Sequence, residues 1–96
     1  MQFLITAYDG KDDEAQARRA AARPAHIDGA KSLKDAGNIL IGGAILDDEG
    51  NMIGSSMVVE FEDREALDQW LHNDPYVTEG VWQDITVSPF RTAVKS

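Results

Sequence analysis

The stretch that decides the fold is residues 38–46, which read Asn-Ile-Leu-Ile-Gly-Gly-Ala-Ile-Leu. Apolar residues occupy both alternating faces of this stretch: Ile39, Ile41 and Ile45 on one, and Leu40, Ala44 and Leu46 on the other. A strand with this pattern is buried on both sides of its sheet. We therefore expect a β-strand here whose two faces are both covered by other parts of the protein.

The residues that follow predict a hairpin, a helix and a final strand. The polar run 47–51 predicts a turn in which Gly50 takes a left-handed conformation, and residues 52–61 predict the returning strand. Asp63 is placed to cap a helix that ends near residue 72, because apolar residues recur there at helical spacing. Asp74 and the proline after it predict one further helical turn closed by Gly80, and residues 81–87 predict the last strand, which Ser88-Pro89 ends.

The residues that precede the deciding stretch predict a strand and an interrupted helix. Residues 2–8 alternate in the manner of a strand. Asp12 is placed to cap an alanine-rich helix that runs to Ala22. Because proline disfavours helix at the residue before it, we expect a kink or break at Arg23 and a second helical segment from Pro24 to residue 36.

The order β-α-β-β-α-β fills residues 1–96 as a single domain. This order predicts an α+β fold of ferredoxin-like type, with a four-stranded antiparallel sheet and both helices on one face. The helices would then leave the other face of the sheet bare. A second copy of the chain is the simplest cover for it, since symmetric dimers are the commonest oligomers, and we expect a homodimer through the sheet face.

Composition and charge exclude several classes of partner. The chain has 17 acidic and nine basic residues, which gives a net charge of −8 and argues against nucleic acid and anionic membranes as partners. It has no cysteine, and therefore no disulfide, thiolate metal site or cysteine nucleophile. Residues 1–10 lack the features of a signal peptide and no window is long and apolar enough to span a membrane, so a soluble, cytoplasmic protein is expected.

Short motifs in both halves of the chain resemble the YciI-like (YCII-related) family of the dimeric α/β-barrel proteins. The motifs are Arg23-Pro24-Ala25-His26-Ile27, Ile41-Gly42-Gly43, Asn73-Asp74-Pro75-Tyr76-Val77 and Val87-Ser88-Pro89-Phe90. Their order and separations carry the resemblance over nearly the whole chain. The resemblance implies a ferredoxin-like subunit that dimerises through its sheet. It also implies a cleft with a paired histidine and aspartate, here His26 and Asp74, and dehydrochlorinase-like chemistry on a chlorinated aromatic compound.

His26 and Asp74 are the candidate catalytic residues. Histidine exchanges a proton near neutral pH, and a neighbouring carboxylate can orient its ring, so the pair is suited to general acid or base chemistry. Each residue also has a structural alternative. We place His26 in the first turn after Pro24, where it could be a core residue with one hydrogen bond, and Asp74 could act only as a helix cap.

Arg23 and Tyr76 are the candidate substrate-binding residues. The guanidinium of Arg23 could hold an anionic substrate, although a solvent-exposed or carboxylate-paired arginine is the commoner case. Tyr76 could line the cleft, although core or interface packing is the commoner use of an aromatic ring at this spacing. The histidines and carboxylates show no metal-ligand spacing and Gly42-Gly43 is not a dinucleotide motif, so neither metal nor cofactor is expected.

Three functions remain open on the sequence. The first is an enzyme that uses His26 and Asp74 for elimination or isomerisation of an aromatic or enolisable small molecule. The second is a non-catalytic dimer that binds or senses a small ligand, and the third is a structural dimer with a vestigial cleft. A fold of this type hosts many functions, so only the site can decide among them.

Overall fold

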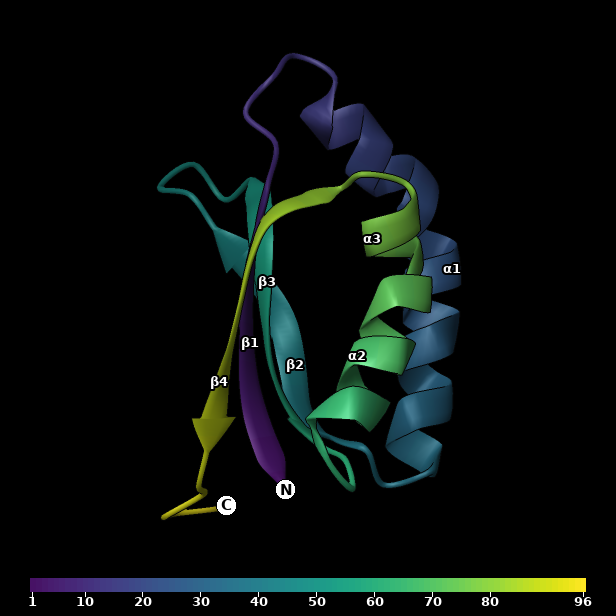
Figure 1. The fold of residues 1–96 in the computed structure, drawn as a ribbon. Coiled ribbons are helices and arrows are strands. Elements are labelled where there is room, and N and C mark those ends of the chain that lie inside the picture. Colours follow the sequence, from purple (N-terminus) through teal and green to yellow (C-terminus); the bar gives the residue numbers. More distant parts are fainter.

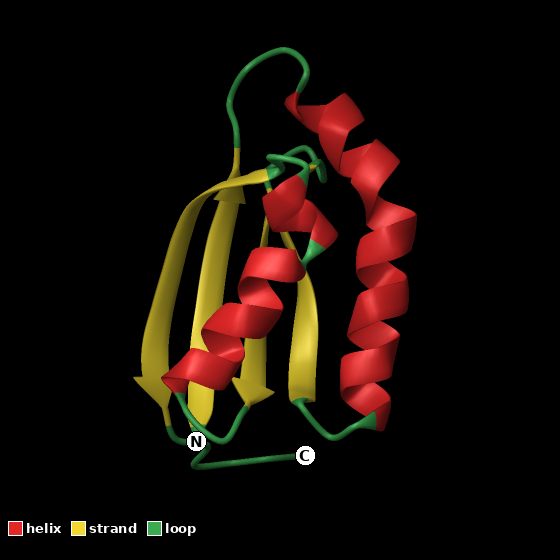
Figure 2. Cartoon of the chain, turned by 45° about the vertical axis from the view of Figure 1, so that its right-hand side comes forward, coloured by secondary structure: helices red, strands yellow, loops and turns green.

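The computed structural model describes all 96 residues as one sheet layer covered by one helix layer (Figure 1). The elements in chain order are β1 (Gln2–Asp9), α1 (Ala15–Asp35), β2 (Ile39–Leu46), β3 (Met52–Glu60), α2 (Arg64–Asn73), α3 (Pro75–Thr78) and β4 (Trp82–Phe90). The three helices all lie on the same side of the sheet, and the other side is bare (Figures 1 and 2).

The strands form one antiparallel sheet in the order β2-β3-β1-β4. This order confirms the predicted ferredoxin-like fold and places β2 and β4 at the two edges of the sheet. The last strand is longer than predicted, because β4 continues through Pro89 to Phe90. A proline is tolerated there since β4 is an edge strand, on which a missing N–H need not interrupt a ladder.

Helix α1 is continuous from Ala15 to Asp35, so a break at Arg23 with a separate second segment is wrong, and only a kink is compatible with the structure. Pro24 lies inside the helix, where it removes one backbone donor. Figure 2 shows that the axis of α1 changes direction along its length, in the manner of a helix that accommodates a proline by bending. The consequence for the site is that His26 belongs to the middle of a long helix and not to a first turn.

The predicted cap of α1 is also wrong. The helix starts after Glu14, whose side chain makes no capping bond, and Asp12 lies outside it. The Asp12 carboxylate instead accepts two hydrogen bonds from the Arg18 guanidinium, at 2.7 and 2.9 Å. This guanidinium lowers the pKa of Asp12 to about 2, so the pair stays ionised over the ordinary pH range. The predicted caps of the later helices are confirmed: Asp63 accepts from the Ala66 N–H, and Asp74 caps α3.

Strand β2 does not alternate as predicted. The pairing with β3 shifts between Ile39 and Ile41, so that Leu40 forms a bulge. Ile39 pairs with Val59 and packs against the core, whereas Ile41 pairs with Val58 and is 68% exposed on the bare face. One extra residue thus moves two isoleucines, predicted to share a face, to opposite sides of the sheet.

The core lies between the sheet and the helices. Its largest fully buried side chains are Phe3, Ile5, Val59, Leu67, Tyr76 and Val81. The residues between them in the central strands, such as Leu4 and Val58, point to the bare face and are only half-buried. No helix in the protein is long and apolar enough to cross a membrane.

Candidate functional site

A cleft of about 530 Å³ runs between α1 and the edge strand β2. Side chains of α1 form one wall, β2 and β3 form the other, and Tyr76 of α3 closes one end. The lining residues that matter for the chemistry are Arg19, Arg23, His26, Lys31, Lys34 and Tyr76. The candidate site therefore lies at the edge of the sheet, where the bent helix α1 stands beside β2 (Figure 2).

His26 and Asp74 meet beside this cleft. The imidazole Nδ1 lies 2.8 Å from Oδ2 of Asp74, and both side chains are almost completely buried. His26 comes from the middle of α1, while Asp74 stands between α2 and α3. The contact predicted between two residues 48 positions apart in the sequence is present in the fold.

The hydrogen bonds of Asp74 determine the orientation of the histidine. Oδ2 also accepts from the backbone N–H of Tyr76 at 3.0 Å, so the same oxygen caps α3 and contacts the histidine. Because that oxygen acts as an acceptor, Nδ1 of His26 carries the proton between them. Nε2 has no hydrogen-bond partner in the protein and is not sealed from solvent, which leaves it free to exchange a proton with a molecule in the cleft.

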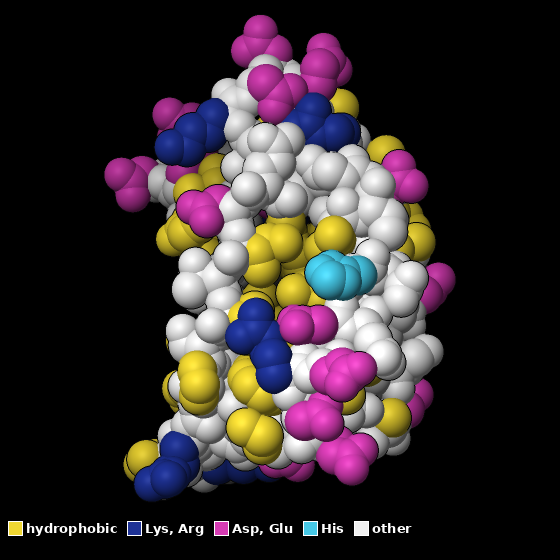
Figure 3. Space-filling model, viewed as in Figure 1, with side chains coloured by type: hydrophobic (Ala, Val, Ile, Leu, Met, Phe, Trp, Pro, Cys, Tyr) yellow, Lys and Arg dark blue, Asp and Glu magenta, His cyan; other side chains and the backbone are white.

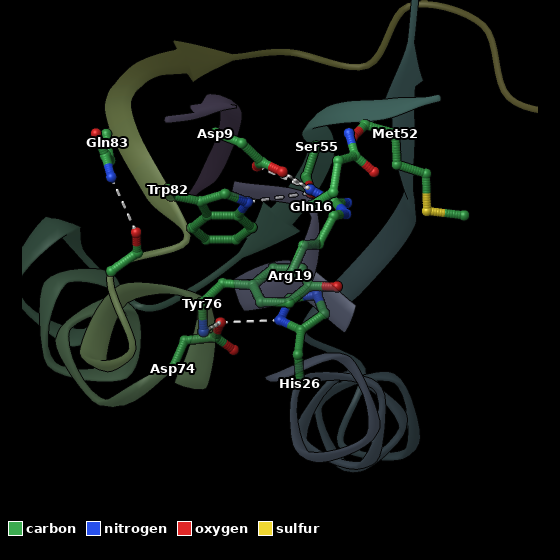
Figure 4. Close-up of polar contacts among 11 residues, drawn as sticks. Asp9, Gln16, Arg19, His26, Met52, Ser55, Asp74, Tyr76, Trp82 and Gln83 are labelled. Carbon is green, nitrogen blue, oxygen red and sulfur yellow. Dashed lines mark hydrogen bonds and ion pairs between the residues drawn. The ribbon is translucent and has the colours of Figure 1, made fainter. Parts of the chain in front are cut away.

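Tyr76 packs directly against the histidine. The two rings are stacked with their centroids 3.8 Å apart and 9° between their planes, and the ring of Trp82 meets both edge-on (Figure 4). Burial raises the pKa of the Tyr76 phenol, against the opposing effect of the Arg19 and Arg23 charges. The phenol is therefore neutral at physiological pH and can donate its proton in a hydrogen bond.

A buried polar network behind Tyr76 was missed in the sequence. Arg19 binds both carboxylate oxygens of Asp9, at 2.9 and 3.0 Å, and donates to the Ser55 hydroxyl at 2.9 Å. Its guanidinium lies 4.8 Å from the centre of the Tyr76 ring, and the Trp82 indole N–H also donates to Ser55. Figure 4 shows Arg19 between Asp9 and the Tyr76 ring. Together these contacts hold Tyr76, and through it the histidine ring, in one position.

A signal for Arg19 was present in the sequence. The buried residues of α1 are Ala15, Arg19, Ala22 and His26, spaced by three or four positions as on one helix face. An arginine on the same face as a candidate catalytic histidine, two turns before it, is a candidate for the same site. This spacing is evident only when residues 15–35 form one helix, whereas the expected kink or break at Arg23 placed the two residues in different segments.

Arg23 lies at the cleft, whereas the second histidine and the tryptophan of α2 do not. Arg23 lines the cleft with an exposed side chain and has no ion-pair partner. His72 is exposed on α2, and Trp70 stacks on Phe61 away from the cleft, so neither takes part in the site. No three histidine or acidic side chains come close enough together to hold a metal ion.

Comparison with known proteins matches the chain over almost its full length. The model of the YCII-related domain family matches residues 1–91. Protein YciI of Escherichia coli is 34% identical over 97 aligned positions, which cover 95% of this chain and 97% of that protein. Protein YciI of Shigella flexneri matches equally well.

Solved structures agree with this match. The structure of 5-chloro-2-hydroxyhydroquinone dehydrochlorinase from Burkholderia phenoliruptrix, in complex with 2,5-dihydroxybenzoquinone, superposes with a TM-score of 0.82 and is 28% identical, covering 95% of this chain and 94% of that one. A dimeric ferredoxin-like protein from an uncultured marine organism superposes with a TM-score of 0.58 at 17% identity, covering 99% and 97% of the two chains. The second likeness is one of fold alone.

Proposed function

Since the chain belongs to the YCII-related domain family, we propose that it is an enzyme that uses His26 and Asp74 for acid–base chemistry on a small cyclic substrate. The reaction is an elimination or an isomerisation of an aromatic or enolisable compound. The observation that carries the proposal is the 2.8 Å bond between Nδ1 and Asp74, which leaves Nε2 of a nearly buried histidine free beside a cleft.

The proposed mechanism begins with proton removal by His26. Nε2 takes a proton from a carbon or oxygen of the substrate, and the carboxylate of Asp74 stabilises the imidazolium that forms. In an elimination, the electron pair left behind forms a double bond and expels the leaving group as an anion. In an isomerisation, the imidazolium returns the proton to a different atom of the same substrate.

Tyr76 and Arg23 have binding roles in this proposal. The neutral phenol of Tyr76 has no hydrogen-bond partner in the protein, so its O–H is available to a substrate oxygen that gains negative charge. Arg23 stands three residues before His26 and so on the same side of α1, where its guanidinium can hold an acidic group of the substrate. The solved dehydrochlorinase supports this substrate class, since a dihydroxyquinone is bound in that protein.

A homodimer through the bare sheet face is part of the proposal. Leu4, Val58 and Ile41 lie side by side across three strands of that face, and Ile41 is 68% exposed. An apolar face of this kind is typically covered by a partner. The proposed partner is a second copy of the chain, packed sheet to sheet.

The test of the enzyme role is release of chloride from 5-chloro-2-hydroxyhydroquinone. The native protein should accelerate the release, and His26→Gln or Asp74→Asn should lower kcat about 10²- to 10⁴-fold, the usual contribution of a positioned acid or base. The double variant should be little worse than the weaker single variant, because residues that act as one unit are not additive. Asparagine preserves the helix cap at position 74, so the fold should survive.

His72→Gln is the matched control, because this second histidine is exposed on α2 outside the cleft and should leave the rate unchanged. Binding of 2,5-dihydroxybenzoquinone by the native protein without any chloride release would favour the alternative, a dimer that binds a small ligand without turnover. Equal rates for the native protein and His26→Gln would rule out the proposed base.

A further inference from the structure

The charge of the cleft is opposite to the charge of the protein. Acidic residues outnumber basic ones by 17 to nine, and Figure 3 shows acidic side chains spread over the face it draws. The cleft, however, is lined by four of the nine basic residues and by no aspartate or glutamate. A cleft lined by charges of one sign concentrates ligands of the opposite charge.

Three of these four charges are free to act on a ligand. Arg19 is neutralised by the two oxygens of Asp9. Arg23, Lys31 and Lys34 make no ion pair, although carboxylates are plentiful in the chain. The free positive charge of the cleft is therefore that of three side chains on the exposed side of α1.

The three free cations flank the proposed base along the helix. Arg23 precedes His26 by three residues, and Lys31 and Lys34 follow it toward the end of α1. A ligand whose reacting atom meets Nε2 of His26 therefore has positive charge on either side of it. The charge of Arg23 also acts to lower the pKa of the Tyr76 phenol, against the larger effect of burial.

The opposite wall of the cleft is apolar, and one of its positions has no side chain. On the side that faces α1 it consists chiefly of Ile39, Gly42 and Met57, whereas the side-chain positions of Ile41 and Gly43 belong to the bare face. A Cβ at position 42 would touch the Met57 side chain at 3.4 Å. The cleft-facing side of β2 therefore has no side chain at Gly42, and an apolar wall that is open at this position suits the flat face of a ring.

From the free cations and this flat wall we propose that the cleft selects small planar acids that carry negative charge at neutral pH. The class comprises ring carboxylates and acidic enols or phenols. The negative oxygen pairs with Arg23, Lys31 or Lys34, the ring lies on the β2 wall, and the reacting atom faces His26. This inference rests on the proposed function, because it names the substrate class of the same site.

Two quinones test the charge selection. In 2,5-dihydroxybenzoquinone each hydroxyl is conjugated to a carbonyl, which makes the compound an acid that is anionic at neutral pH. In 2,5-dimethyl-1,4-benzoquinone methyl groups of similar size replace the hydroxyls, and the compound is neutral. Neither can form a thiol adduct with this protein, which has no cysteine. Binding of both is measured by quenching of tryptophan fluorescence.

We expect the acidic quinone to bind at least about 10-fold more tightly than the neutral one at low ionic strength, with the difference shrinking as salt screens the exposed cations. Arg23→Gln should weaken binding of the acidic quinone about 3- to 10-fold, as should Lys31→Gln combined with Lys34→Gln. Arg23→Lys should recover part of the loss, because it restores the charge. Arg91→Gln and Lys95→Gln, which remove exposed charges outside the cleft, are the matched controls.

Three results would each overturn the inference. The first is failure of the acidic quinone to bind at millimolar concentration, and the second is equal binding of the two quinones. The third is an unchanged affinity in the variant that lacks all three free cations. The test of this inference can be separated from the test of the proposed function. His26→Gln should abolish turnover but keep the preference for the acidic quinone. Turnover by the native protein without any preference for the acidic quinone would reject this inference alone.

Discussion

Arg19 and Asp9 form an ion pair whose two side chains are nearly buried, with exposed fractions of 6% and 4%. The pair joins α1 to β1, reaches Ser55 on β3, and lies beneath the Tyr76 ring. Removing one member of such a pair leaves an uncompensated buried charge, which is far more costly than removing both. The effect of a substitution at this point therefore depends on what happens to the partner.

Arg19→Met is expected to lower the free energy of unfolding by about 3–5 kcal/mol, because it leaves the Asp9 carboxylate buried and unpaired. Replacing both residues, as in Arg19→Met with Asp9→Leu, should cost less than Arg19→Met alone. Urea unfolding followed by circular dichroism measures both. Arg18→Met is the control, since it breaks the exposed pair with Asp12 and should change stability little. A double variant less stable than Arg19→Met would contradict this account.

At the scale of the element, α1 is the helix on which the site depends. It carries Arg19, Arg23 and His26, together with the two lysines of the cleft. Pro24 lies among them, in a helix that is unbroken but bent (Figure 2). Local rules correctly placed a helix irregularity at this proline but wrongly divided the helix into two segments, because packing of the helix on the sheet outweighs one lost hydrogen bond.

Pro24→Ala should raise the free energy of unfolding by about 1–3 kcal/mol, since it returns a backbone donor to the helix interior and removes a clash with the preceding turn. The same change should straighten α1 and weaken the contact between His26 and Asp74. Thermal unfolding measures the first effect, and an NMR titration of the His26 ring in the native and variant proteins measures the second. Ala25→Gly, at the next and exposed position, is the opposing control and should destabilise the helix. A Pro24→Ala variant less stable than the native protein would contradict this expectation. It would show that the bend stabilises the fold by more than the proline destabilises the helix.

At the scale of the whole molecule, one face of the sheet is covered by helices and the other is covered by nothing within the chain. The bare face carries a mixture of polar and apolar side chains and is less apolar than the sequence predicted. The bulge at Leu40 turns Ile39 toward the core, while polar residues such as Thr6 and Ser56 lie between the apolar ones. The remaining apolar patch of Leu4, Val58 and Ile41 is the proposed dimer contact.

Sedimentation equilibrium at about 10⁻⁵ M should show the native protein as a dimer, because interfaces of this class are large and persist at such concentrations. Val58→Glu should shift it to monomer, since it places a carboxylate at the centre of the patch. Val94→Glu introduces the same charge at a residue that is 91% exposed and lies beyond the sheet, and should leave the dimer intact. A native monomer under these conditions would reject the interface.

The sequence by itself determined the order and type of the elements, the hairpin turn, and the caps at Asp63 and Asp74. These features depend on residues within a few positions of one another, whose conformational preferences act locally. The motifs around His26 and Asp74 also indicated a pair, through their resemblance to a family. The sequence could not show that one oxygen of Asp74 serves both the histidine and the Tyr76 backbone.

Only the tertiary structure decided the continuity of α1, the face of each isoleucine in β2, and the burial of Arg19 against Asp9 and Ser55. Each of these results is a competition between a local preference and contacts made with distant parts of the chain. A proline inside a helix, a one-residue bulge and a buried charge all carry a local cost. They persist here because packing of the helices against the sheet and pairing of groups from different elements offset that cost.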